Sequence, residues 1–205
     1  MSKKRDIIDA AISLFAQNGF SATPTTAVAK KAGVAQGLIF HYFKTKEGIL
    51  VEIIAELGDK YTSETDKIIE NSENGLDAII NIIQFHFMFE NENTTELMVL
   101  LHDIPPAIDS QLTEASIVLS NRIDQTIAQL KECINKGQAD GSIRNDASSE
   151  SAFIIRALLN GLSRLHFSMQ NKPDYKTDIF KTIQFCRKSL EPELSDFSRR
   201  DVPRS

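Results

Sequence analysis

Hydrophobic residues recur every three or four positions along almost the whole of this 205-residue chain. That spacing gathers apolar side chains on one face of an α-helix, whereas a half-buried strand would alternate them. We therefore expect an all-α protein of about nine helices, with no strand pattern and no internal repeat. The predicted helices span about 7–18, 24–32, 36–43, 46–70, 76–89, 95–102, 110–136, 148–169 and 174–190.

The breaks between the first three helices predict a helix-turn-helix. Gly19 is a plausible end for the first helix, and Thr23 is expected to cap the second, with Pro24 in its first turn. Gly33 then interrupts the pattern before the short helix at 36–43. Two short helices around a glycine-containing turn are typical of this motif.

Charge is distributed unevenly along the chain. The net charge is -5, yet residues 1–48 carry seven basic and three acidic residues, which leaves 16 basic and 25 acidic residues for the remainder. A basic head on an acidic body favours a polyanionic partner at one end. Short segments also deviate by a few charges by chance, so this feature leaves the partner open.

The segment Ile7–Leu50 carries a family resemblance. It reads IIDAAISLFAQNGFSATPTTAVAKKAGVAQGLIFHYFKTKEGIL and resembles, without gaps, the DNA-binding domain of the TetR family. The matching blocks are residues 8–20, 28–34, 37–43 and 46–47. The resemblance implies a helix-turn-helix DNA-binding domain at 1–48 and an effector-binding and dimerisation domain at 49–191. The polar residues 192–205 are predicted to form a disordered tail.

The helix at 36–43 has the two faces that reading DNA requires. A recognition helix needs a buried face to fix its angle and an exposed face to reach base edges in the major groove. Gln36 stands at its start, where an amide side chain can bond to adenine. The expected buried residues are Val34, Ile39 and Phe43, and the expected outward residues are Gln36, Gly37, Phe40 and His41.

The resemblance also implies individual roles. Positions matching Thr26 and Gln36 commonly contact bases in the family, and those matching Thr25, His41, Tyr42 and Lys46 commonly contact phosphates. Gly37 would let the backbone approach closely, and Leu38 would meet thymine methyl groups. Gln36 and Lys46 could instead be solvated, His41 could simply be a partly exposed aromatic, and Tyr42 could pack against the helix at 46–70. The predicted DNA-binding residues are Thr25, Thr26, Gln36, Gly37, Leu38, His41, Tyr42 and Lys46.

Three positions depart from the family pattern. Phe40 stands where tyrosine is usual, Ala35 replaces the usual Ser or Thr cap, and Leu38 replaces a common threonine. Fewer polar groups therefore reach the DNA backbone, and we expect either weaker affinity per monomer or more reliance on Leu38 for apolar contact with thymine methyl groups.

The aromatic and methionine residues of the larger domain suggest an effector site. A pocket lined in this way would suit an apolar or aromatic small molecule, although the same residues could equally fill the core. The histidines show no short ligand spacing, so no metal site or cofactor is expected. The candidate effector-binding residues are Phe85, Met88, Phe89, Met98, His102, Phe153 and Phe167.

Assembly and mechanism follow from the resemblance. The helices within 148–190 would pair across a homodimer, which would place two helix-turn-helix motifs on the half-sites of a palindromic double-stranded DNA operator. An effector would shift the helix at 46–70 and release a repressor from that operator. The pattern does not separate a repressor from an activator.

Other classes of protein are disfavoured. We find no glycine-rich phosphate loop and no nucleophile signature around Cys133 or Cys186, so an enzyme is not expected. Two cysteines fit a reducing cytoplasm, and no apolar run approaches the roughly 20 residues of a membrane helix. A helical adaptor remains the alternative, and salt-dependent binding to duplex DNA would separate the two.

Overall fold

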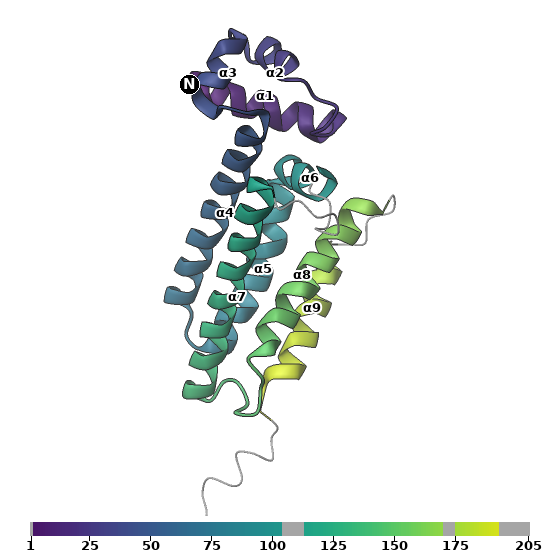
Figure 1. The fold of residues 1–205 in the computed structure, drawn as a ribbon. Helices are drawn as coiled ribbons and strands as arrows, with labels where there is room; N and C mark the ends of the chain where they lie inside the picture. The colour runs from purple at the N-terminus through teal and green to yellow at the C-terminus, as the bar shows by residue number, and fades with distance from the viewer. Residues whose placement is uncertain (1, 104–112, 170–174, 193–205) are drawn as a thin grey trace, which may run out of the picture. The chain divides into compact units, whose positions relative to one another are not determined.

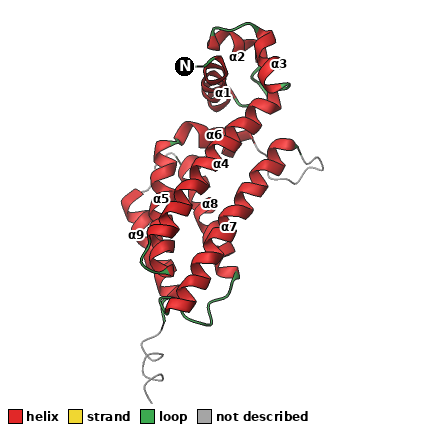
Figure 2. Ribbon diagram, turned by 90° about the vertical axis from the view of Figure 1, so that its left-hand side faces the viewer, coloured by secondary structure: helices red, strands yellow, loops and turns green. Residues whose placement is uncertain are grey.

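The computed structural model describes residues 2–103, 113–169 and 175–192 (Figure 1). The described residues form nine helices and no strand (Figure 2), which confirms the predicted all-α fold. The predicted tail beyond residue 192 and the predicted start of the seventh helix near 110 lie outside the described residues. The helices are α1 Lys3–Asn18, α2 Thr25–Ala32, α3 Gln36–Phe43, α4 Lys46–Asn71, α5 Gly75–Glu92, α6 Thr94–Asp103, α7 Glu114–Asp140, α8 Glu150–Ser168 and α9 Tyr175–Leu190.

The chain divides into two compact units. Unit 1 comprises Met1–Thr62 and Glu90–Asp124, and unit 2 comprises Ser63–Phe89 and Gln125–Ser205. Helices α4, α5 and α7 each contribute residues to both units. This is a division by compactness, and the functional division predicted at residues 48 and 49 stays a prediction.

A single hydrophobic core holds unit 1 together. Phe15 of α1, Val28 of α2 and Ile39 of α3 are fully buried in it. Val99 of α6 and Ala115 of α7 join the same cluster, and α1 packs against both α2 and α6. The three N-terminal helices therefore rest on a buried base, which fixes the orientation of α3.

The ends of α1 and α2 show why the chain turns where it does. Gly19 has φ 84° and Gly33 has φ 63°, a region that favours glycine. The expected cap at Thr23 is wrong: Pro24 occupies the N-cap position and makes no side-chain cap hydrogen bond. The buried Thr23 hydroxyl instead donates to the carbonyls of Gly19 at 2.8 Å and Leu14 at 3.3 Å.

A very short connection joins α3 to α4. The Thr45 hydroxyl oxygen accepts the Gly48 N–H at 2.9 Å and so caps α4. A Cβ at Gly48 would lie 2.0 Å from the Phe43 carbonyl oxygen, so the close approach of the two helices requires glycine there. The last turn of α3 and the first turn of α4 are therefore held in a tight fit.

Unit 2 has its own core, to which the end of α4 and helices α5, α7, α8 and α9 contribute. Phe87, Leu130 and Leu159 are among its buried side chains. Most apolar residues of α5 are buried, as predicted, whereas Met88 is exposed.

Helix α7 runs past the glycine at which we expected it to end. Gly137 lies within the helix. Glycine is required there because Ile143 packs over this turn, and a Cβ at residue 137 would lie 2.5 Å from its side chain. The chain turns at Gly141 instead, with φ 83°. Asp140, at the end of α7, accepts the N–H of Gly75 at 2.9 Å and so helps to cap α5.

Candidate nucleic-acid interface

Helix α3 presents two distinct faces. Ile39 and Phe43 are buried in the core of unit 1, and Val34 is half-buried against it. Gln36, Gly37, Phe40 and His41 are exposed, as the sequence predicts. We call these four residues the reading face. An anchored helix with an exposed mixed face has the geometry that major-groove recognition requires.

The start of the reading face is linked to α2. The Gln36 side-chain amide donates to the Thr25 hydroxyl at 3.3 Å, and Thr26 beside it is exposed. A Cβ at Gly37 would meet nothing within 4 Å, so the chain itself does not require glycine there. Ala35 at the N-cap makes no side-chain cap hydrogen bond, as its methyl side chain dictates. Two predicted base-contacting residues, Thr26 and Gln36, therefore lie at one end of the motif.

The second half of α3 is rich in exposed rings. Phe40 and Tyr42 are 45% and 41% exposed, and the His41 ring meets the Tyr42 ring edge-on at 5.2 Å. Leu38 is half-buried against the core, so part of its side chain is already covered within the protein. Phe40 is not among the predicted DNA-binding residues. A large apolar residue one turn after Gln36 and predicted to face outward could have indicated a binding surface.

Lys46 is engaged within the protein. Its ammonium group donates to the backbone carbonyls of Phe20, Thr23 and Ser21 at 2.8, 3.2 and 3.3 Å. The predicted phosphate contact would have to compete with these three hydrogen bonds.

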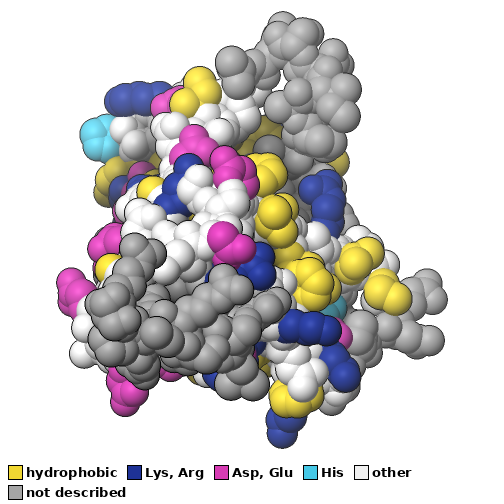
Figure 3. Space-filling view, turned by 90° about the horizontal axis from the view of Figure 1, so that it is seen from below, with side chains coloured by type: hydrophobic (Ala, Val, Ile, Leu, Met, Phe, Trp, Pro, Cys, Tyr) yellow, Lys and Arg dark blue, Asp and Glu magenta, His cyan; other side chains and the backbone are white. Residues whose placement is uncertain are grey.

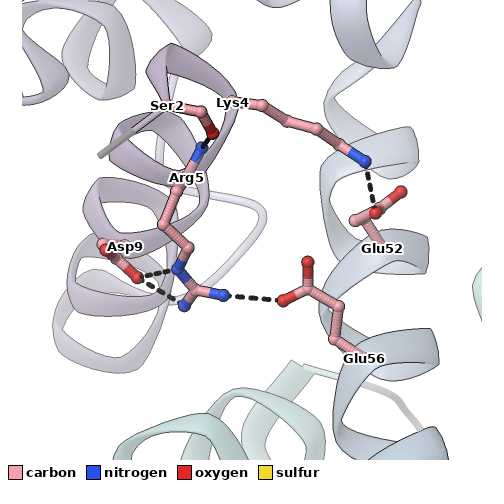
Figure 4. Close-up of polar contacts among 6 residues, drawn as sticks. All are labelled: Ser2, Lys4, Arg5, Asp9, Glu52 and Glu56. Carbon is pink, nitrogen blue, oxygen red and sulfur yellow. Dashed lines mark hydrogen bonds and ion pairs between the residues drawn. The ribbon is translucent and has the colours of Figure 1, made fainter.

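Two of the N-terminal basic residues are also paired internally (Figure 4). Lys4 lies 2.5 Å from a Glu52 carboxylate oxygen, and Arg5 lies 2.7 Å from one of Glu56. Arg5 also pairs with Asp9, and this hydrogen bond raises the pKa of its guanidinium. These cations tie α1 to α4, so the charge count alone overstates the positive charge available to DNA.

Other basic residues lie closer to the reading face. Lys30 and Lys31 are exposed in the last turn of α2, and Lys44 directly follows α3. Lys31 donates to the Ser13 hydroxyl at 2.6 Å, and Lys44 donates to the His41 carbonyl at 3.3 Å. None of these three lysines is among the predicted DNA-binding residues, although the sequence alone places them within or directly after the helix-turn-helix.

The candidate effector residues are scattered. Phe85 and Phe89 of α5 lie together, with ring centroids 5.5 Å apart, and Phe167 is half-buried in the same unit. Met88 is 58% exposed and Phe153 is 61% exposed, so neither is enclosed. Met98 is half-buried in unit 1. The side chain of His102 lies outside the described residues.

Unit 2 contains a buried polar cluster that the sequence did not predict. His86 of α5 lies 3.1 Å from the Ser163 hydroxyl of α8. His166 of α8 lies 2.7 Å from Asp178 of α9, and its ring is 6.0 Å from that of Phe87. The spacing of Ser163 and His166 on one helix face could have suggested it. No cluster of three or more metal-ligating side chains occurs in the described residues.

A shallow hollow of about 270 Å³ also lies on unit 2. Lys67, Ile68, Asn71, Ser72 and Asn81 line it. None of the seven predicted effector residues belongs to this lining.

Helices α8 and α9 expose large apolar side chains. Figure 3, seen from below, shows hydrophobic side chains in a band on the side where these helices lie in Figure 1. We use the name apolar α8–α9 face for five exposed residues of these two helices: Phe153, Ile154, Leu165, Phe180 and Phe185. Among the described residues, no helix is both long and apolar enough to span a bilayer.

Comparison with known proteins gives consistent matches. Residues 7–53 match the family described as bacterial regulatory proteins, tetR family. The chain is 27% identical over 125 residues to the fatty acid metabolism regulator protein of Bacillus subtilis (strain 168), covering 61% of this chain and 60% of that protein. It is 24% identical over 145 residues to the HTH-type transcriptional repressor KstR2 of Mycolicibacterium smegmatis, covering 71% and 69% respectively.

A solved structure shares the fold over a longer span. It is the transcriptional regulator FadR from Bacillus subtilis in complex with stearoyl-CoA, matched with a TM-score of 0.75 at 20% identity. That match covers 91% of this chain and 99% of the FadR chain. By sequence, in contrast, the match spans less than two thirds of the first relative named above.

Proposed function

Because the chain belongs to the tetR family of bacterial regulatory proteins, we propose that it is a ligand-responsive transcriptional repressor. It acts in the cytoplasm as a homodimer and binds a palindromic operator in double-stranded DNA. The observation that carries this proposal is α3, which is anchored by the buried Ile39 and Phe43 and exposes Gln36 in its first turn and His41 on the side away from the core. The relative KstR2 is a repressor by name, which favours repression over activation.

Each group near the reading face has a role in the proposal. Gln36 and Thr26 read base edges, and Phe40 and Leu38 offer apolar contact to thymine methyl groups. Thr25, His41 and Tyr42 contact phosphates and fix the register. Gly37 lets the start of α3 approach the groove closely. Lys30, Lys31 and Lys44 add sequence-independent attraction.

The partner of the apolar α8–α9 face is a second copy of the chain. Five large, exposed apolar side chains on two helices are a feature that marks protein interfaces. Pairing two copies through this face would give each dimer two reading faces for two half-sites.

The effector is a small molecule with a large apolar part. FadR from Bacillus subtilis is described in complex with stearoyl-CoA, and the sequence relative from that organism is a fatty acid metabolism regulator. We propose a ligand of that kind, an acyl chain carried on a polar group, for unit 2 of this chain. Phe85, Phe89 and Phe167 of unit 2 are the candidates for contact with it, followed by Met88 and Phe153 of the same unit. Met98 and His102, the other two predicted residues, belong to unit 1 and are not assigned to this site.

Helix α4 would couple the effector to DNA. It is continuous from Lys46, three residues after α3, to Asn71, and it contributes to both units. An effector that favours one placement of α4 by a few kcal/mol would change the spacing of the two reading faces and release the operator.

Selection of bound duplexes from a random DNA library at near-physiological salt tests this proposal. We expect enrichment of an inverted repeat by the purified protein, and loss of binding when a long-chain acyl-CoA is added. Recovery of no motif, with binding that vanishes as salt rises, would favour a generic basic surface and a helical adaptor. Tighter binding with the acyl-CoA would contradict release by the effector.

A further inference from the structure

Lys46 lies against the turn between α1 and α2, not at the edge of the reading face. Its Nζ atom is 2.8 Å from the Phe20 carbonyl oxygen, 3.2 Å from that of Thr23 and 3.3 Å from that of Ser21. It also lies 4.4 Å from the centre of the Phe20 ring. An ammonium group has three N–H donors, so these three carbonyls match its full hydrogen-bonding capacity.

The turn at residues 19–24 is built so that these carbonyls converge. Gly19 has φ 84°, the Thr23 hydroxyl donates to the Gly19 carbonyl at 2.8 Å, and the Thr23 N–H donates to the Phe20 carbonyl at 3.2 Å. Carbonyl oxygens aimed at one point repel one another unless a cation lies between them. The Lys46 ammonium supplies that cation.

The turn leads directly into the DNA-contacting end of the motif. Pro24 precedes α2, and its carbonyl accepts the N–H of Ala27 at 3.0 Å. Thr25 begins α2 and accepts a hydrogen bond from Gln36 of α3. The placement of the turn therefore sets where α2 begins, and Thr25 at that point accepts the hydrogen bond from Gln36.

We propose that Lys46 is a positioning residue for sequence reading: it holds the α1–α2 turn and does not serve as a phosphate ligand. The effect on DNA rests on the proposed function, whereas the holding of the turn does not. Two substitutions separate the two roles. Lys46→Met removes the charge, and Lys46→Arg keeps it but offers a planar fork in place of a compact ammonium.

The first measurement compares affinity for the selected operator with affinity for random duplex DNA, across a range of salt. We expect both variants to bind the operator about 10-fold more weakly, to bind random DNA within about twofold of the parent, and to keep its salt slope. A simple loss of folded protein would lower both affinities equally. If Lys46→Arg behaved like the parent while Lys46→Met lost about one unit of slope, Lys46 would be a phosphate ligand.

The second measurement needs no DNA. Hydrogen exchange of the Thr23 amide in the free protein should be about 10-fold faster in both variants, because the turn opens locally. Lys30→Met is the matched control, since Lys30 is exposed on α2, and it should leave that exchange unchanged. Unchanged exchange in both Lys46 variants would overturn the proposal. Faster exchange in a protein that selects no operator would overturn the proposed function and leave the holding of the turn in place.

Discussion

Helix α3 and the α8–α9 pair both expose aromatic rings, but the side chains exposed beside those rings differ. On α3, Phe40 and Tyr42 stand among polar or positively charged side chains, including Gln36, His41 and Lys44. Each ring is less than half exposed. Such a mixed face can hydrogen-bond, stack and attract phosphate at once.

On α8 and α9 the rings are accompanied by exposed aliphatic side chains, and the Lys181 ammonium lies 6.0 Å from the centre of the Phe180 ring. Phe153, Phe180 and Phe185 are 56–61% exposed, and Ile154 and Leu165 lie on the same helices at similar exposure. Nothing in this group donates or accepts a hydrogen bond through its side chain. The contrast supports the two proposed partners: a polyanion for α3, and a second apolar surface for α8 and α9.

The apolar α8–α9 face can be an interface only if the core of unit 2 beneath it is firmly packed. Burial raises the pKa of the Cys133 thiol to about 12 and that of Cys186 to about 11. At pH 8 we expect both thiols to react with a thiol reagent at least about 100-fold more slowly than in the urea-unfolded protein, since the thiolate is the reactive form. Because both pKa values are raised on folding, their contribution to stability is complete below pH 9 and is lost as the pH rises toward 11–12.

Mass spectrometry of the labelled protein measures this protection, and Cys186→Ser reports Cys133 alone. Fast labelling of the native protein at pH 8 would mean that the core of unit 2 opens readily. The apolar face could then be a product of loose packing and not an interface.

Introducing negative charge into the apolar α8–α9 face tests whether this face forms the dimer interface. Phe153→Glu with Phe185→Glu should leave the helices folded, because both rings are more than half exposed, while it turns dimers into monomers. We expect operator affinity to fall about 100-fold, since the second half-site is no longer tethered. Sedimentation and binding measurements check both effects.

Gln84→Glu is the matched control, since Gln84 is exposed on α5 of the same unit. A double variant that stayed dimeric would move the interface away from the apolar face. A monomer with unchanged operator affinity would show that dimerisation does not contribute to DNA binding.

The two regions were not equally predictable from the sequence. The faces of α3 follow largely from local rules: helical spacing placed Ile39 and Phe43 inside and His41 outside, while Gln36 is exposed because it begins the helix. Effector contacts depend on how long helices pack, which spacing does not define. Phe153 and Met88 are predicted to contact the effector, and both are exposed. Ser163 is not among the predicted residues, and it lies buried against His86.

Tertiary contacts also overrode local signals within unit 1 and unit 2. Thr23 has the chemistry of a helix cap, but its hydroxyl donates to the carbonyls of Gly19 and Leu14 instead. Gly137 has the chemistry of a helix end, yet it serves close packing against Ile143. Lys46 has the chemistry of a phosphate contact, and three carbonyls distant in sequence surround it.

A smaller effect should follow from the amide at the start of α3. Gln36→Ala removes one base contact, so we expect a loss of 1–3 kcal/mol, about 5- to 150-fold in affinity, for the selected operator. Relaxed preference at one base pair of each half-site should accompany it, and a repeat of the library selection measures this. Gln17→Ala on α1 is the control, because Gln17 is an exposed glutamine away from α3. An unchanged motif would mean that Gln36 is simply solvated.

The smallest effect concerns the ion pairs that join α1 to α4. Glu52 and Glu56 are partly exposed, as are Lys4 and Arg5, so each pair should contribute less than about 1 kcal/mol. Glu52→Gln with Glu56→Gln should therefore lower the free energy of unfolding by less than about 2 kcal/mol, and by less at high salt. Urea unfolding at two salt concentrations measures this loss.

The same variant tests which positive charges belong to the DNA-binding surface. If Lys4 and Arg5 serve to hold α1 on α4, releasing them should leave the salt slope of DNA binding unchanged, whereas Lys30→Met with Lys31→Met should reduce it by up to about two units. A steeper slope for the glutamate variant would instead mean that the carboxylates mask DNA contacts. In that case α1 would belong to the DNA interface. The region to compare with the apolar α8–α9 face would then be α1 together with α3.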